Sequence, residues 1–264
     1  MQKQTEKIGV MDSGLGGLTV VREMERILPG ENIVYFGDNA NCPYGNRPRE
    51  EIFDLSCAML DFMQKEGVKT VAIACNTIST LVQDLRTRYR FPIVSIIEEA
   101  CKYVAAEGIP HVGVFATEFT ISQGLYGKLL GQLRPEMKVF GVASRTLATL
   151  IDEGRFDDNE TIEEVNSMLG RMKAAHGELK HIVLGCTHYP IVQDLFEKAA
   201  PGITFINPAA VQAEAVKAQL AGLGLLNNAQ QPSLEIYTSG ESQPYEAAIK
   251  KLRISRPLSI TVMP

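Results

Sequence analysis

Short apolar runs alternate along this chain with longer segments whose apolar residues recur at helical spacing. We expect strands at residues 8–11, 32–36, 70–74, 93–96, 111–115, 138–142, 181–184, 203–206, 234–237 and 258–262. Runs such as residues 71–73, which do not alternate with polar residues, are typical of strands covered on both faces. Between most strands the apolar spacing is helical, as in residues 20–28. The pattern predicts an α/β protein with parallel sheets.

The two halves of the chain repeat one plan around a cysteine. A lysine, an apolar strand and a small residue precede Cys75, and polar residues and a helical pattern follow it; the same order surrounds Cys186. Residues 8–12 and 112–117 also resemble each other. We therefore expect two pseudo-symmetric halves, about 1–97 and 98–207, followed by a tail over 208–264. A thiol between a strand end and a helix start lies near unpaired N–H groups, a setting that lowers a thiol pKa.

Charge and apolar content narrow the class of protein. The net charge is −5 with both signs interspersed, which argues against nucleic acid as a partner. The apolar runs are shorter than ten residues, so we expect no membrane span. Residues 1–7 lack the apolar segment of a signal peptide, which favours the cytoplasm.

The other cysteines and the histidines give no metal or disulfide pattern. Five cysteines without a C-x-x-C spacing do not predict a disulfide framework, and four histidines without ligand spacing do not predict zinc. Cys57 and Cys101 fall within helical patterns and are expected in the core. Cys42 falls in a loop, and the sequence assigns it no role.

Two glycine-containing loops follow the first two strands, at the edge where ligands bind in open α/β sheets. Residues 12–17 form neither a dinucleotide fingerprint nor a phosphate loop, so they are either a tight turn or a binding loop. Asp12 either serves the site or caps the next helix. Residues 37–45 are either an ordinary turn or a loop that offers N–H groups and the Tyr44 hydroxyl to an anion.

Two thiols at equivalent positions suit the inversion of a carbon centre. One acid/base group removes a proton from one face while a second returns a proton to the other. Asp12 near one thiol and His188 near the other would tune those transfers. Two alternatives remain open: a pair of buried structural cysteines, and a cysteine hydrolase in which Cys186 and His188 form a covalent intermediate without Cys75.

Four motifs resemble the signature blocks of bacterial glutamate racemases, in the order and spacing of that family. They lie at residues 12–17, 43–45, 74–77 and 184–190, and the similarity extends over nearly the whole chain. The resemblance implies cofactor-independent proton transfer at Cα of glutamate, supplying D-glutamate for peptidoglycan. It also implies two α/β domains, 1–97 plus 208–264 and 98–207, with the active site in the cleft between them. A homodimer is usual for the family.

The resemblance also assigns roles to residues. Cys75 and Cys186 would be the acid/base thiols, with Asp12, His188 and Asp152 as their auxiliary groups. No metal or other cofactor is implied. The residues expected to bind substrate are Ser13, Pro43, Tyr44, Gly45, Asn76, Thr77, Thr117, Thr120 and Thr187.

Several positions depart from the family pattern. Asn41 replaces a common arginine, residues 78–80 replace smaller ones, and residues 143–145 lack the usual Cys-Pro. Asp152 is shorter than the expected acid. An aspartate or broad-specificity amino-acid racemase, and a regulatory binding protein of the same fold, remain as alternatives.

Overall fold

The computed structural model describes residues 5–177 and 179–263, so part of the N-terminal segment discussed above lies outside the described residues. The first parallel sheet contains β1 (Ile8–Asp12), β2 (Ile33–Gly37), β3 (Thr70–Ile73), β4 (Ile93–Ser95), β9 (Leu234–Thr238) and β10 (Leu258–Val262). The second contains β5 (His111–Thr117), β6 (Lys138–Ser144), β7 (His181–Gly185) and β8 (Thr204–Ile206). All the expected strands are confirmed, with ends shifted by no more than two residues.

The two sheets repeat one topology. The strand order is β10-β9-β2-β1-β3-β4 in the first and β6-β5-β7-β8 in the second, and every neighbouring pair is parallel. The segment β2-β1-β3-β4 therefore corresponds to β6-β5-β7-β8. Cys75 follows β3 and Cys186 follows β7, so the two thiols occupy equivalent positions.

Helices cover both faces of the first sheet. Val10 points into an apolar cluster with residues of α1 (Leu18–Ile27) and α11 (Pro208–Gly222). Met11, its neighbour on β1, points into a second cluster with residues of α2 (Arg49–Lys65). This alternation is the two-residue period of a strand, and it explains why β1 is apolar on both faces.

The remaining helices connect the strands in sequence order. Their bounds are α3 (Asn76–Ser79), α4 (Val82–Arg86), α5 (Ile96–Ala106), α6 (Glu118–Gln123), α7 (Leu125–Leu133), α8 (Leu147–Asp152), α9 (Asn159–Ala175), α10 (Gln193–Ala199) and α12 (Gln243–Leu252). Short 3₁₀ turns are η1 (Asn39–Asn41), η2 (Tyr44–Asn46) and η3 (Tyr189–Val192). The helix expected after Pro190 thus begins as a 3₁₀ turn and continues as α10. Among the described residues, no helix has the length and apolar content to cross a bilayer.

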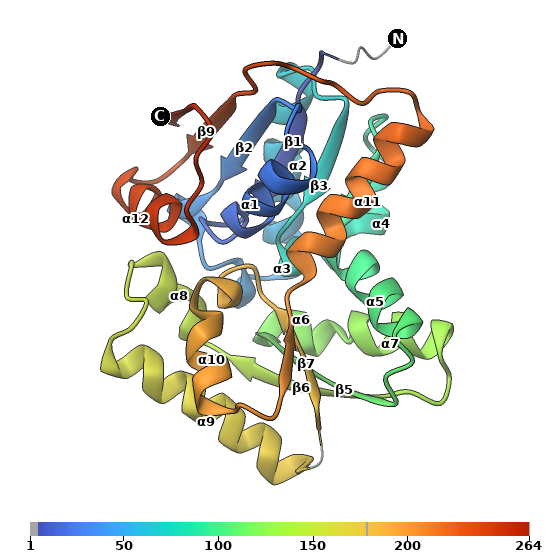
Figure 1. Ribbon diagram of the computed structural model, residues 1–264, viewed down its shortest axis with the longest axis vertical. Helices are drawn as coiled ribbons and strands as arrows, with labels where there is room; N and C mark the ends of the chain where they lie inside the picture. Colours follow the sequence, from blue (N-terminus) through green and yellow to red (C-terminus); the bar gives the residue numbers. More distant parts are fainter. Residues whose placement is uncertain (1–4, 178, 264) are drawn as a thin grey trace.

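The chain returns to the first sheet through α11. Figure 1 shows α11 rising from the second sheet towards the first, where β9, α12 and the C-terminal end lie. Gln212 of α11 donates from Nε2 to the carbonyls of Ile73 and Val94, both at 2.9 Å, and so ties the helix to β3 and β4. The strand membership agrees with the expected domain limits near 97 and 207, which stay a prediction.

Candidate active site

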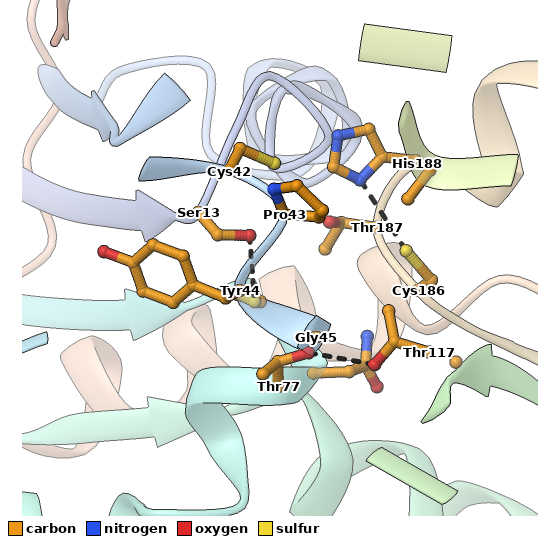
Figure 2. A pocket seen from close by; sticks show the side chains of 14 residues that line it. Ser13, Cys42, Pro43, Tyr44, Gly45, Thr77, Thr117, Cys186, Thr187 and His188 are labelled. Carbon is orange, nitrogen blue, oxygen red and sulfur yellow. Dashed lines mark hydrogen bonds between the residues drawn. The ribbon is translucent and has the colours of Figure 1, made fainter. Parts of the chain in front are cut away.

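A small cavity of about 20 Å³ lies where the carboxyl ends of the two sheets meet (Figure 2). No lysine or arginine is among the residues that line it. They are Ser13, Cys42, Pro43, Tyr44, Gly45, Cys75, Asn76, Thr77, Thr117, Ala148, Gly185, Cys186, Thr187 and His188.

Cys75 enters this cavity from the first domain. Its Sγ lies 3.4 Å from the Ser13 hydroxyl, and the residue is 4% exposed. Burial, with a further contribution from the Asp12 charge, raises the pKa of Cys75 to about 12. The expected lowering by a helix start is therefore wrong here, because α3 has only four residues and desolvation disfavours the thiolate.

Asp12 does not line the cavity, but its charge acts on Cys75. Its carboxylate accepts hydrogen bonds from the Gly14 N–H at 3.0 Å and, across the cleft, from the Thr187 hydroxyl at 3.0 Å. Burial raises the pKa of Asp12 to about 6, although His188 and these donors oppose the rise. Asp12 caps no helix, since α1 begins after Gly17 without a side-chain cap. Its contacts instead join the two domains.

Cys186 enters from the second domain and faces a different neighbour. Its Sγ lies 3.6 Å from Nδ1 of His188, whose Nε2 lies 2.9 Å from Asp152 Oδ1. Burial alone would lower the pKa of His188, but the Asp152 carboxylate outweighs it and raises that pKa well above its usual value. The His188 cation in turn outweighs burial and lowers the pKa of Asp152. The two groups therefore form a buried imidazolium–carboxylate pair.

Asp152 ends α8 but is held by donors of the first domain. Its Oδ2 accepts from Cys42 Sγ at 2.9 Å, and its Oδ1 accepts from the Leu15 N–H at 3.3 Å and from Asn39 Nδ2 at 3.4 Å. Cys42, to which the sequence assigned no role, thus lines the cavity and binds an auxiliary group. Asp152 itself does not line the cavity.

Ser144 lies in the segment 143–145, which lacks the Cys-Pro usual in the family. Its hydroxyl accepts from the N–H groups of Thr146 at 3.3 Å and Leu147 at 3.0 Å, at the start of α8. The helix that presents Asp152 therefore begins at the segment where Cys-Pro is usual.

Hydrogen-bond donors line the remaining wall. Tyr126, which the sequence did not single out, donates to Asn76 Oδ1 at 2.8 Å. This contact leaves Nδ2 of Asn76 buried and without a hydrogen-bond partner in the described part of the chain. The hydroxyls of Thr77 and Thr117 lie 3.1 Å apart. Thr120 lies outside the cavity lining and bonds to both, at 3.3 and 3.0 Å.

Tyr44 differs from the expectation that its hydroxyl meets an anion. The hydroxyl donates to Asp38 Oδ2 at 2.5 Å and lies 3.6 Å from Met59 Sδ. The Asp38 carboxylate also accepts hydrogen bonds from Asn41 Nδ2 at 3.1 Å. Asn41, which stands where arginine is common in the family, therefore stabilises this loop. Gly45 is required next to Tyr44, because a Cβ there would lie 2.7 Å from Cβ of Thr117 across the cleft.

This geometry defines a two-domain α/β protein that presents one thiol from each half to a single cavity. The sequence matches the family described as Asp/Glu/Hydantoin racemase over residues 8–216, and the chain belongs to that family. It is 36% identical to a glutamate racemase of Carboxydothermus hydrogenoformans over 92% of this chain and 90% of that protein.

Solved structures of similar proteins extend the match to the whole fold. The glutamate racemase RacE1 of Bacillus anthracis superposes with a TM-score of 0.91 at 29% identity, covering 99% of this chain and 98% of that one. A glutamate racemase of Francisella tularensis in complex with D-glutamate has a TM-score of 0.89 at 27% identity, with the same coverage.

Proposed function

We propose that this protein is a cofactor-independent glutamate racemase that uses Cys75 and Cys186 as its two acid/base groups. The observation that carries the proposal is that both thiols, from equivalent positions of the two halves, line one cavity. The similarity to named glutamate racemases, one of them with D-glutamate bound, supports glutamate as the substrate.

The two thiols have neighbours of opposite charge, and this suggests their starting roles. Nδ1 of His188 lies 3.6 Å from Cys186 Sγ, and in this proposal Cys186 is the base that removes the Cα proton from one face. Cys75, kept neutral by burial and by Asp12, donates its proton to the other face. The carbon loses and gains one proton, and the enzyme is left with the thiol at Cys186 and the thiolate at Cys75. The reverse reaction starts from that form.

Donors along the cavity wall would hold the substrate carboxylates. Asn76 offers its free Nδ2, and Thr77, Thr117 and Thr187 offer hydroxyls. Neutral donors bind a carboxylate without placing a second cation beside the thiols. Ser13, Pro43 and Gly45 complete the wall on the first-domain side.

A cysteine hydrolase is the second candidate, because Cys186, His188 and Asp152 lie in the order of a nucleophile, a base and its orienting acid. Substitution of Cys75 distinguishes the two functions. Of the two thiols, a hydrolase would need Cys186 alone, whereas a racemase needs both.

The test is incubation with L-glutamate in heavy water without added cofactor, following Cα deuterium by NMR and optical activity by circular dichroism. We expect deuterium at Cα together with racemisation. Cys75→Ala and Cys186→Ala should each abolish racemisation, while Cys57→Ala, a buried cysteine in α2, should keep it. No exchange with glutamate or aspartate in folded, reduced protein would refute the proposal, and exchange with aspartate alone would establish the aspartate alternative.

The cellular setting belongs to the same proposal. We propose that the D-glutamate product serves peptidoglycan synthesis and that the chain acts in the cytoplasm as a homodimer, as the family resemblance implies. Sedimentation of the purified protein tests the dimer directly, and a monomer at working concentration would contradict it.

A further inference from the structure

We infer that Cys42, Asp152 and His188 form a binding site for a borderline-soft divalent cation such as Zn²⁺, and that occupancy of this site inhibits the protein. The inhibition rests on the proposed racemase function, whereas the binding does not. Neither thiol of the proposed reaction belongs to this cluster.

Three different ligand types converge in the cluster. Cys42 comes from the loop after β2, Asp152 from the end of α8 and His188 from the segment after β7. One ligand atom from each, a sulfur, a carboxylate oxygen and a ring nitrogen, all lie within 4.8 Å of one another. Zinc takes these three atom types at about 2.0–2.3 Å, so a small inward movement of the side chains would coordinate it.

The surroundings favour a cation at this point. His188 is buried, and its Nε2 lies 2.9 Å from Asp152 Oδ1, so two of the three ligand atoms already face each other away from bulk solvent. Gly14 packs directly on the cluster, because a Cβ there would lie 2.9 Å from both Asp152 oxygens and 3.2 Å from Cys42 Sγ. From the first domain, the Asp12 carboxylate interacts electrostatically with all three members of the cluster.

The charges of the three ligands suit a divalent cation in a buried site. A cation of charge +2 held by a Cys42 thiolate, the Asp152 carboxylate and a neutral His188 ring forms a group with no net charge. Figure 2 shows Cys42 and His188 on the same side of the cavity, from which the ion and a fourth ligand such as water could enter.

Binding would interfere with the proposed reaction in two ways. The metal would hold His188 through Nε2 and remove the cation beside Cys186. It would also link Cys42 of the first domain to Asp152 and His188 of the second, and so oppose any opening of the cleft. The sequence predicted no zinc site because the three ligands are far apart in the chain, and only folding brings them together.

The binding test is a Cd²⁺ titration of the full chain without glutamate, followed by the ultraviolet thiolate-to-cadmium band, with Zn²⁺ affinity measured against a chromophoric chelator. We expect one ion per chain, and Cys42→Ser and Asp152→Asn should each weaken binding by more than about tenfold because each removes a ligand. Cys57→Ala and Cys75→Ala should bind like the unmodified chain. Circular dichroism checks that each variant is folded.

Two results would overturn the inference. Unchanged affinity in folded Cys42→Ser and Asp152→Asn would do so, and so would loss of binding in Cys75→Ala alone, which would place the ion between the two thiols of the cavity. The inhibition test compares racemisation with and without Zn²⁺. A chain that binds Cd²⁺ through Cys42 but does not racemise glutamate refutes the proposed function alone, whereas racemisation insensitive to saturating Zn²⁺ refutes the inhibition.

Discussion

Replacing Asp12 with asparagine should change how the stability of the protein depends on pH. Burial raises the pKa of this carboxyl from 3.8 to about 6, so the folded chain holds the proton more tightly than the unfolded chain. The stabilising effect of that proton is complete below about pH 4 and is lost as the pH rises through about 6. A shift of this size corresponds to about 3 kcal/mol in the free energy of unfolding.

The assay is urea unfolding followed by far-ultraviolet circular dichroism, because the chain contains no tryptophan. Asparagine does not ionise, so the variant does not lose stability when the pH rises through the pKa of Asp12. Between about pH 4.5 and about pH 7.5, the free energy of unfolding of Asp12→Asn relative to the unmodified chain should rise by about 2 kcal/mol. Asp54→Asn, at an exposed position of α2, is the matched control and should show no such trend.

The sign of this pH trend tests whether burial disfavours the Asp12 charge. A difference that stays constant with pH, or that falls as the pH rises, would show that burial does not oppose the Asp12 charge. The hydrogen bonds from Gly14 and Thr187 would then be strong enough to compensate the desolvation.

Three further changes probe the cavity. Tyr126→Phe frees the Asn76 amide to rotate, and we expect KM for glutamate to rise about tenfold with a smaller change in kcat; an unchanged KM would contradict this role. Alkylation of Cys75 by iodoacetamide, followed by peptide mass spectrometry, should accelerate continuously from about pH 7 to about pH 10, because its pKa is about 12; a plateau near pH 9 would contradict that value. Gly16→Ala places a Cβ 2.5 Å from Thr187 Oγ1 and 2.8 Å from the His188 backbone nitrogen, so kcat/KM should fall about a hundredfold in folded protein.

The strands and the positions of the thiols could be predicted because both depend on local patterns. A strand buried on both faces must be continuously apolar, and its end is marked by the glycine or polar residue that follows. Cys75 and Cys186 stand at two such ends, and parallel strands bring their carboxyl ends to one edge. The repeated plan around each cysteine therefore indicated the two halves and the site.

The side-chain contacts could not be predicted because they depend on partners far away in the chain. The Tyr44 hydroxyl points to Asp38 rather than into the cavity, and the spacing of residues in the sequence does not indicate this direction. Cys42 acquires its contact with Asp152 only when the two domains meet. The pKa of Cys75 rises because the completed cleft removes water from it, whereas the sequence shows only the strand end and the helix start.

The two thiols have different neighbours, and this asymmetry affects the kinetic constants of the proposed reaction in its two directions. Cys75 lies beside a carboxylate and Cys186 beside an imidazolium, so the free protein favours one of its two protonated forms. The enantiomers of glutamate have equal free energies in water, and therefore kcat/KM must be the same in both directions. Any difference in kcat between the directions must be matched by an equal ratio of KM values. Removing the Asp12 charge should thus change kcat and KM in each direction while leaving the two kcat/KM values equal to each other.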